Sequence, residues 1–526
     1  MSNRIRFIAT ADIFRNDYHV IVSVFNGKIN FFPFVAQEEC GFFEFDEKYF
    51  IANLHGLFTS KCKAAVFNIL DWEPTKYDNV NDFCQLIRNS LNERNVPCCF
   101  INGDYYAASS CLVKANVSAE IGDFVFFLFF IGDVIHVSKL EYTENGYDCK
   151  TSNVFEYRRI PPNRIIQQIF GDCNPLKIIV GAPESDHPGM QWLKRNALEN
   201  MKPKIIDVGN SFALNNQNYL IETEKYLTDH EYVKFHVIPK VQNHFVLGLL
   251  FAKNMCFESF DTDDKNLPFE ETKIIPRIGV EIMLGYFISD NTSEKLVQLK
   301  KITLPSHAHQ WHVTLTIDAD NFPVYDFQAI RYGRIFELPE YLDKMLQTKI
   351  PVIGLYENLS FICVNGKDGK YKFLDAWNDS WGEELVISFA KKEPQFCKNA
   401  CESLRTKPSY CVYDLMQIMS LPPGTIEKIP RWFFNLSSDS EHPVLLEYDN
   451  FGGGKKRESP EFLFSLLIKE HIKAIKDETG ENPKELVFCI PNYTGEPKEL
   501  LENGIQKACK LLEVGCSVIQ YERRFT

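Results

Sequence analysis

Residues 459–522 read SPEFLFSLLIKEHIKAIKDETGENPKELVFCIPNYTGEPKELLENGIQKACKLLEVGCSVIQYE, and they decide the predicted fold. Ser459 and Pro460 are typical of a helix N-terminus, and apolar residues then recur at helical spacing until Gly480. The expected elements are a helix after Ser459, a strand at 485–490, a helix around 501–512 and a strand from Ser517. This strand–helix–strand order is typical of a parallel α/β sheet.

The same stretch resembles the first lobe of the ATPase of the DnaK-type, seventy-kilodalton heat-shock chaperones. The family has a strand ending in Val-Pro-Ala-Tyr and a later one ending in Asn-Glu-Pro-Thr. Here the first ends at 490–493 (IPNY), and Glu522 matches the hinge Glu, although Arg523 replaces its Pro. Upstream, 353–364 (IGLYENLSFICV) and 412–419 (VYDLMQIM) resemble Ile-Gly-Ile-Asp-Leu-Gly-Thr-Thr-Tyr-Ser-Cys-Val and Val-Phe-Asp-Ala-Lys-Arg-Leu-Ile. The resemblance implies an actin-like lobe.

Shorter matches imply that this lobe occurs twice. Strands are expected at 5–11, 18–25 and 28–32, with a hairpin at Asn26-Gly27, and 18–33 resembles the opening hairpin of the lobe. Residues 42–70 resemble the next family segment, with 65–70 (AVFNIL) in the place of Val-Phe-Asp-Ala-Lys. We therefore expect 43–70 and 374–419 to superpose as copies of one lobe.

Two further segments resemble other parts of the same family. Residues 123–142 resemble the opening hairpin of the second lobe, and 176–181, with a helix near Met190, resemble its Val-Gly-Gly-Ser loop. From 231 to 330 strands alternate without helix signals, and 299–327 resembles the substrate-binding β-sandwich. A short helix is expected at 338–348.

The predicted fold class is degenerate α/β actin-like ATPase lobes, with the first lobe duplicated, plus an all-β sandwich. The expected domains are a shortened nucleotide-binding domain at 1–228, the sandwich at 229–335, a linker helix at 336–350 and a second, partial first lobe at 351–526.

Most groups that would bind ATP and Mg²⁺ are replaced. Such a site needs glycines near the phosphates, hydroxyl and N–H donors, an Asp for Mg²⁺ and a Lys that stabilises charge. At the matching positions stand Tyr356 for the Asp, Asn358 for a Gly, Leu359 for a Thr, Met416 and Leu70 for the Lys, and Phe129-Phe130-Ile131-Gly132 for Gly-Gly-Gly-Thr. The nucleotide-binding positions retained are Gly354, Ser360, Gly181 and Ser185.

Three other motifs favour structural roles. Residues 452–456 (GGGKK) do not fit the phosphate-loop order and predict a hairpin tip. His307, His309 and His312 have no cysteine at zinc-finger spacing, so no metal site is expected. Asp318 and Asp320 are predicted on one face of a strand, without an acid–base role.

Composition favours a soluble cytoplasmic protein. Of the 526 residues, 24% are charged and 45% hydrophobic, as in ordinary globular chains. A net charge of −13 argues against a nucleic-acid binder. The 16 cysteines show no paired CxxC spacing, no secretory leader is recognised, and the longest apolar run, 124–131, is too short to cross a membrane.

The predicted function is binding of exposed apolar peptides or of a protein partner by a pseudo-chaperone or scaffold that has lost its ATPase and needs no cofactor. The alternative is an active ATP- and Mg²⁺-dependent chaperone. A small-molecule kinase on the same fold is disfavoured, because sugar kinases have no such sandwich. A fused or mispredicted gene would also explain the duplication. A peptide site is expected at loops such as 254–260, unless neighbouring lobes close it.

Overall fold

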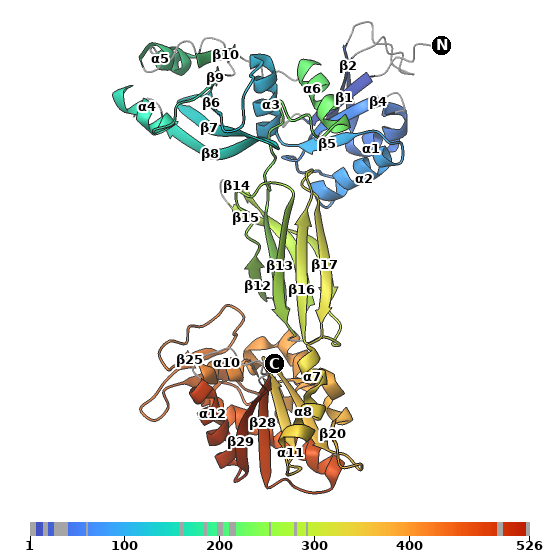
Figure 1. Cartoon of the computed structure of the whole chain (residues 1–526), viewed down its shortest axis with the longest axis vertical. Coiled ribbons are helices and arrows are strands. Elements are labelled where there is room, and N and C mark those ends of the chain that lie inside the picture. The colour runs from blue at the N-terminus through green and yellow to red at the C-terminus, as the bar shows by residue number, and fades with distance from the viewer. Residues whose placement is uncertain are drawn as a thin grey trace. The chain divides into compact units, whose positions relative to one another are not determined.

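The structure is a computed structural model. It describes residues 7–13, 19–25, 40–58, 62–156, 159, 162–182, 187–196, 204–209, 217–251, 254–277, 281–290, 293–491 and 498–521. The chain forms two compact units, each with helices and sheets (Figure 1). The first unit comprises 1–242, 263–269 and 316–324, and the second comprises 243–262, 270–315 and 325–526.

The first unit contains two five-stranded sheets. Sheet 1 has the order β3 (Cys40–Asp46), β2 (His19–Phe25), β1 (Phe7–Ile13), β4 (Cys62–Asn68) and β5 (Cys98–Ile101). Sheet 2 has the order β8 (Gly146–Glu156), β7 (Val134–Thr143), β6 (Phe124–Ile131), β9 (Lys177–Gly181) and β10 (Ile205–Gly209). The expected strands at 5–11 and 18–25 correspond to β1 and β2; the expected strand at 28–32 and its Asn26-Gly27 turn lie outside the described residues.

The helices of this unit are α1 (Glu47–Leu57), α2 (Val80–Asn92), α3 (Gly103–Ala115), α4 (Pro162–Phe170), α5 (Pro188–Asn196) and α6 (Gln217–Thr228). Helix α5 confirms the helix expected near Met190. Helix α3 follows sheet 1 in the chain but packs against β9 and β10, whereas α6 follows sheet 2 and packs against β1 and β4. The rings of Tyr106 and Tyr219 meet where α3 and α6 cross, with centroids 4.9 Å apart. The two sheets are therefore joined by exchanged helices.

The second unit contains a third sheet of the same plan. Its main order is β20 (Tyr371–Phe373), β19 (Leu359–Asn365), β18 (Val352–Tyr356), β28 (Glu485–Pro491) and β29 (Gly515–Tyr521), and β21 (Glu383–Glu384) also pairs with β19. In all three sheets the first three strands in sequence form an antiparallel meander. The fourth strand pairs in parallel with the first, and the fifth pairs in parallel with the fourth. One β-β-β-α-β-α-β plan thus occurs three times.

This plan corrects the predicted match between 43–70 and 374–419. Residues 65–68 lie in β4, which pairs in parallel with β1, so the topological equivalent of β4 is β28. Residues 411–412 form β24, which pairs antiparallel with β22 in a separate small sheet. Both segments are apolar runs after a helix, and the sequence pattern does not contain the strand direction that distinguishes them.

The stretch from 459 to 521 forms the elements expected from its pattern. Helix α11 (Pro460–Thr479) begins after Ser459, whose hydroxyl accepts the Phe462 N–H at 3.2 Å, and ends at Gly480 with φ 79°. A positive φ favours glycine because it has no Cβ. Helix α12 (Lys498–Leu511) joins β28 to β29, and these two strands pair in parallel.

Seven strands make two smaller sheets of the second unit. One has the order β12 (Asn254–Ser259), β11 (His244–Phe251), β14 (Glu281–Asp290) and β15 (Ser293–Thr303); the other has β13 (Phe269–Pro276), β16 (Gln310–Ile317) and β17 (Pro323–Ile330). On β16 Val313, Leu315 and Ile317 are buried, and the residues between them are half-buried, which gives the strand one core face. Residues 254–259 therefore form a strand and not the open loop that we predicted.

The remaining elements connect these sheets to sheet 3 or follow β20. They are α7 (Gly333–Phe336), α8 (Leu338–Met345), β22 (Ile387–Ser388), β23 (Gln395–Phe396), α9 (Lys398–Thr406), β24 (Cys411–Val412), α10 (Leu415–Ser420), β25 (Asn435–Ser437), β26 (Leu445–Asp449) and β27 (Lys455–Glu458). Helix α8 confirms the helix expected at 338–348, and its Leu338 and Leu342 cover one face of sheet 3. The GGGKK stretch joins β26 to β27, as predicted for a hairpin tip.

Candidate functional site

The hairpin β18–β19 stands where the resemblance places the phosphate loop, and it is closed. Tyr356 pairs with Leu359, so only Glu357 and Asn358 form the turn, and Glu357 has φ 48°. The Asn358 side chain is buried, and its Oδ1 accepts the backbone N–H of Asp414 at 3.0 Å. The Asn358 oxygen therefore holds the turn to the protein's own backbone, whereas its buried Nδ2 makes no hydrogen bond.

Ser360 is bonded entirely within the core. Trp377 Nε1–H donates to its hydroxyl oxygen at 3.0 Å, and His471 Nε2 lies 2.9 Å from the same oxygen. His471 Nδ1 lies 2.6 Å from the carbonyl oxygen of Leu467, so Nδ1 carries the proton and Nε2 accepts the Ser360 hydroxyl hydrogen. Both Ser360 and His471 are 0% exposed. This pair is a structural contact and not an accessible nucleophile and base.

The other matched positions of the second unit are also packed. Gly354 faces α8, where an added Cβ would lie 3.0 Å from Leu338 Cδ2. Met416 is buried in α10, and the Tyr356 ring lies 4.7 Å from that of Tyr332. Burial raises the pKa of the Tyr356 hydroxyl. Apolar and aromatic groups thus occupy the positions of the Asp and the Lys of the family.

In the first unit the matched hairpin β6–β7 is closed in the same way. Ile131 pairs with Val134, which leaves Gly132-Asp133 as a two-residue turn with φ 57° at Gly132. A glycine at the first position is typical of a tight type II′ turn. Gly181 ends β9 and pairs with Phe129 inside sheet 2. Ser185 lies outside the described residues, as does Glu522.

The match of Leu70 to the catalytic lysine is also wrong, because the strand before it, β4, is equivalent to β28. Leu70 directly follows β4 and is buried among the side chains of α1 and α2. Because β4 corresponds to β28, Leu70 does not occupy the position equivalent to Met416. Of the retained residues that the structure describes, Gly181 belongs to the first unit, and Gly354 and Ser360 belong to the second.

Of the three histidines of the 307–312 segment, His307 and His309 both lie against Trp381, with ring centroids 5.7 and 5.4 Å from it. His309 is buried; its Nδ1 accepts the Tyr332 N–H at 3.0 Å, so its Nε2–H donates to the carbonyl oxygen of Ser380 at 2.9 Å. Burial lowers the pKa of His309, which favours this neutral form. Among the described residues no group of three or more His, Cys, Asp and Glu side chains is arranged to hold a metal ion.

Asp318 and Asp320 lie in the turn after β16 and not on the strand as predicted. Asp318 accepts the N–H groups of Asp320 and Phe322 at 2.9 and 3.0 Å and forms an ion pair with Arg88. Asp320 accepts the Phe100 N–H at 3.1 Å, and burial raises its pKa to about 6. The carboxylates thus fasten this turn within the first unit.

A cavity of about 310 Å³ lies in the second unit, between the two smaller sheets and α9. Its floor is apolar and comes from Leu249, Ile275, Ile282 and Trp311, all at least nine-tenths buried. This volume lies at the lower end of the range typical of small-ligand sites, which are mostly apolar, whereas this cavity has about as many polar as apolar lining residues. We take this cavity as the candidate functional site.

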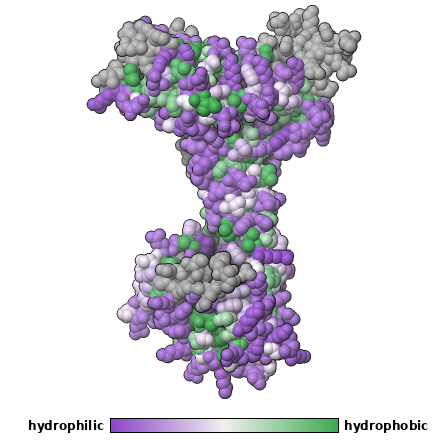
Figure 2. Space-filling view, in the orientation of Figure 1, coloured by the Kyte–Doolittle hydropathy of each residue, from purple (hydrophilic) through white to green (hydrophobic). Residues whose placement is uncertain are grey.

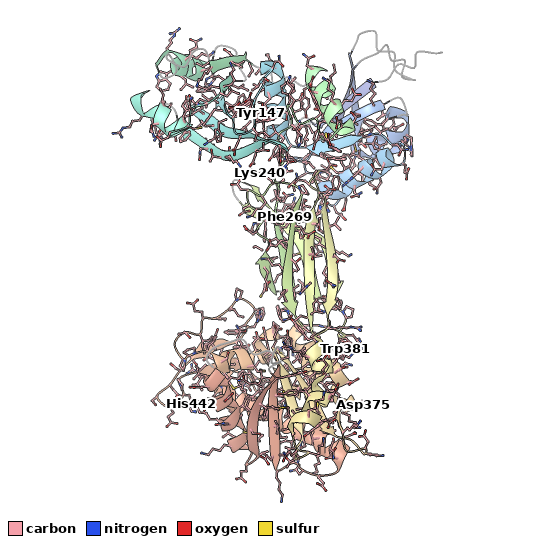
Figure 3. All side chains as sticks on the ribbon, viewed as in Figure 1. Tyr147, Lys240, Phe269, Asp375, Trp381 and His442 are labelled. Atoms are coloured by element: carbon pink, nitrogen blue, oxygen red, sulfur yellow. The ribbon has the colours of Figure 1, made fainter. Side chains whose placement is uncertain are left out.

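Arg277 fixes one wall of the cavity. Its guanidinium donates to the carbonyl oxygens of Ser306, Ala308, Trp381 and Gly382 at 2.6–3.2 Å, and its Nε lies 2.9 Å from Glu384 Oε1. Trp381, whose carbonyl oxygen accepts one of these hydrogen bonds, is labelled in Figure 3. Arg277 and Glu384 are 5% and 7% exposed. This buried cation holds the strand ends of the smaller sheets to the segment that carries β21.

Charged side chains of α9 and of β21 also line the cavity. Lys398 and Arg405 of α9 line the cavity together with Glu383. Glu383 accepts the Lys398 N–H at 3.2 Å, and burial together with nearby Glu384 raises its pKa. The cavity therefore combines an apolar floor with a polar wall of both charge signs.

The face of β11 and β12 that we expected to remain open is largely covered. The thiol of Cys256 donates to the carbonyl oxygen of Pro430 at 3.2 Å, and the ring of Phe251 lies 5.0 Å from that of Phe433. Phe260 is 1% exposed, whereas Phe257 remains 36% exposed. The segment before β25 thus closes this patch, and the cavity at Leu249 takes its place as the apolar site.

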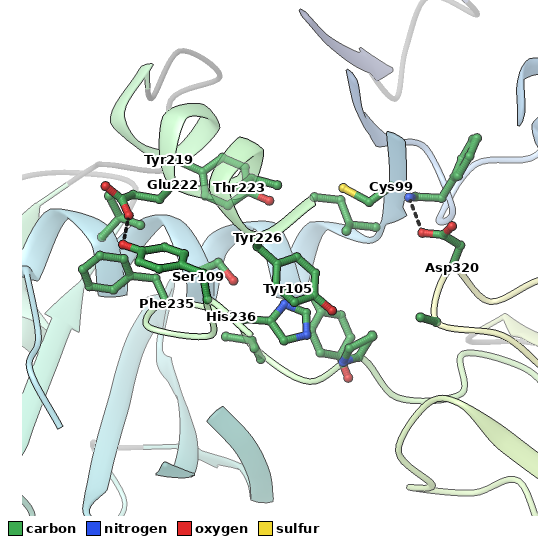
Figure 4. A pocket seen from close by; sticks show the side chains of 17 residues that line it. Cys99, Tyr105, Ser109, Tyr219, Glu222, Thr223, Tyr226, Phe235, His236 and Asp320 are labelled. Carbon is green, nitrogen blue, oxygen red and sulfur yellow. Dashed lines mark hydrogen bonds between the residues drawn. The ribbon is translucent and has the colours of Figure 1, made fainter. Parts of the chain in front are cut away.

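The first unit has a smaller cavity of about 70 Å³ between α3, α6 and the segment 232–239 (Figure 4). Its lining includes Tyr105, Tyr226 and His236, and the rings of Tyr226 and His236 stack with centroids 3.8 Å apart. Burial lowers the pKa of His236 to about 4. A space of this size holds a few water molecules and is too small for a peptide side chain with its backbone.

Sequence reasoning missed the residues of the larger cavity. They come from β11, β13, β14, β16, β21 and α9, so no short motif contains them. The one available signal was the alternation of apolar residues in the strands. This alternation predicts which residues point into the core, but it does not predict where a cavity remains between the strands. Arg277 follows Pro276 at a strand end, and nothing local distinguishes it from a solvent-exposed arginine.

No known protein family matches this chain, and no curated protein matches it. Within the described residues, no helix is both long and apolar enough to cross a membrane.

Proposed function

We propose that this protein binds an extended polypeptide segment by taking one apolar side chain into the 310 Å³ cavity, without ATP turnover. In this proposal the three sheets of one plan are degenerate actin-like lobes, and the two smaller sheets are a chaperone-like β-sandwich. The observation that carries it is the cavity itself, with its floor of Leu249, Ile275, Ile282 and Trp311.

The face of the molecule drawn in Figure 2 supports a cavity rather than a broad docking face. On the side of the molecule drawn in Figure 2, hydrophilic residues predominate and hydrophobic ones occur in small separate groups. Scattered apolar residues are normal on soluble proteins, whereas a client with exposed apolar side chains needs a place where they leave water. Transfer of a leucine or phenylalanine side chain from water contributes roughly 1.5–3 kcal/mol. A micromolar complex needs roughly 8.2 kcal/mol, so backbone hydrogen bonds to the extended segment and its flanking side chains have to supply the rest.

The absence of ATP turnover is supported by the closed turns. The groups nearest the expected phosphate position are engaged with the protein: Asn358 with Asp414, and Ser360 with Trp377 and His471. Removing one electrostatic group from such a site typically costs about 10²–10³ in rate, and here several are absent together. The ATP-driven alternative requires these contacts to break.

A binding titration tests the proposal directly. A fluorescent heptapeptide with a central leucine should bind the full chain saturably, at micromolar Kd. The variant Leu304→Glu places a carboxylate on the half-buried cavity lining and should weaken binding at least tenfold. Ile274→Glu is the matched control, because Ile274 is 54% exposed and does not line the cavity. Equal affinity of the two variants would refute the cavity as the site.

A further inference from the structure

Two cysteines of the second unit meet where α12 turns into β29. Cys509 lies in the last turn of α12 and is fully buried, whereas Cys516 is the second residue of β29 and half-buried. The Val514 N–H donates to the carbonyl oxygen of Cys509 at 3.2 Å, and Glu513 has φ 56°. The chain therefore doubles back between the two cysteines.

The strand register directs the Cys516 side chain toward the helices. Cys516 pairs with Leu486 in parallel register, and Phe488, two residues further on, has its ring 6.4 Å from that of Phe464 in α11. Residues two apart on a strand share a face, so Leu486, Phe488 and Cys516 all face the helix layer. Helix α12 packs on β29 in that layer, and burial together with the proximity of Cys516 raises the pKa of the Cys509 thiol.

We propose that Cys509 and Cys516 form a reversible intramolecular disulfide, which makes this junction a redox-sensitive site. The half-buried Cys516 reacts first, as a thiolate, with a small disulfide such as oxidised glutathione and releases one glutathione thiolate. The Cys509 thiol then gives up its proton as its sulfur attacks Cys516 in the mixed disulfide, and the second glutathione leaves. Two protein thiols are oxidised, one glutathione disulfide is reduced to two thiols, and the two protons pass to the leaving groups.

Two other pairs of neighbouring cysteines in the described residues each lie within or beside a single element. Cys397 and Cys401 lie four residues apart at the start of α9, and the Cys401 thiol donates to the Cys397 carbonyl oxygen at 3.5 Å. Cys98 and Cys99 are consecutive on β5, so their side chains point to opposite faces of sheet 1. The pair at α12 and β29 differs from these two pairs because it joins a helix to the strand on which that helix packs.

Tryptic mapping of the native full chain tests this inference. After incubation with oxidised glutathione and alkylation of free thiols, cleavage at Lys507, Lys510 and Arg523 should yield 508–510 disulfide-linked to 511–523. The linked species should disappear on reduction and in Cys516→Ser. It should persist in the control Cys401→Ser, whose substituted thiol is also buried.

A second variant separates the two steps. In Cys509→Ser, Cys516 should accumulate as the glutathione mixed disulfide, because no resolving thiol remains. In the native chain that mixed disulfide should stay at least tenfold less abundant than the internal disulfide. Failure to detect the linked peptides, or a stable mixed disulfide at Cys516 in the native chain, would overturn the proposal; either result is independent of peptide binding.

Discussion

At the scale of single residues, a match in sequence does not specify which atoms a side chain contacts. Gly354 and Ser360 occupy positions that resemble a phosphate loop, yet one faces the Leu338 side chain and the other bonds to Trp377 and His471. These partners lie 17 and 111 residues from Ser360 in the chain. The identity of the residue was visible in the sequence, but its bonding depends on tertiary packing.

We expect Ser360→Ala to destabilise the second unit by about 1–3 kcal/mol, because it leaves a buried indole N–H and a buried imidazole nitrogen without a partner. Urea unfolding followed by tryptophan fluorescence measures the loss. The control Ser440→Ala, at an exposed serine, should change stability by less than about 0.5 kcal/mol. Equal stability of the two variants would show that the Ser360 network contributes nothing.

His471 predicts a pH dependence with a definite sign. Burial lowers its pKa to about 4, below the unfolded value of 6.5. Between these values the unfolded chain binds a proton that the folded chain does not, so stability is lost as pH falls from about 6.5 to 4. His471→Gln removes this titration. Urea midpoints between pH 7 and 4 should therefore fall more steeply for the native chain than for the variant; parallel slopes would contradict the assignment.

At the scale of elements, hydrophobic periodicity and capping signals predicted much of the secondary structure. The helix after Ser459, the helix at 338–348 and the parallel strands of 485–521 form as expected. The match of 65–70 to 412–419 was wrong, because a short apolar run does not show which strand it pairs with or in which direction. The cavity was not predictable in this way, since six separate elements supply its walls.

The contact of Arg277 with the β21 segment gives a prediction at this scale. Arg277→Met removes the guanidinium from four carbonyl oxygens and leaves the buried Glu384 without its cation. Breaking a buried pair in this way costs about 3–5 kcal/mol. The cost is measured by urea unfolding of the full chain.

Arg457→Met is the matched control for Arg277→Met. Arg457 pairs with Glu447 on the β26–β27 hairpin, and its side chain is 63% exposed. Exposed pairs contribute about 0–1 kcal/mol, so this variant should unfold nearly as the native chain does. If both arginine variants lost the same stability, the proposed role of Arg277 in holding the cavity wall would be wrong.

At the scale of the whole molecule, one sheet plan is repeated three times, and two smaller sheets carry the candidate site. Sheets 2 and 3 both have this plan, and in both the first hairpin ends in a two-residue turn, at 132–133 and 357–358. The repetition itself could be suspected from short sequence matches. Its third instance, sheet 2 with the same strand order, became clear only from the pairing of β6 to β10.

The central claim is that the cavity captures an apolar peptide side chain without a nucleotide cycle. The most direct measurement is the dissociation rate of the fluorescent heptapeptide from the full chain, chased with unlabelled peptide in the presence and absence of Mg²⁺-ATP. We predict one rate, unchanged by ATP within twofold, and at least tenfold faster in Leu304→Glu than in Ile274→Glu. ATP-accelerated release that Ser360→Ala abolishes would contradict the account and favour an active chaperone.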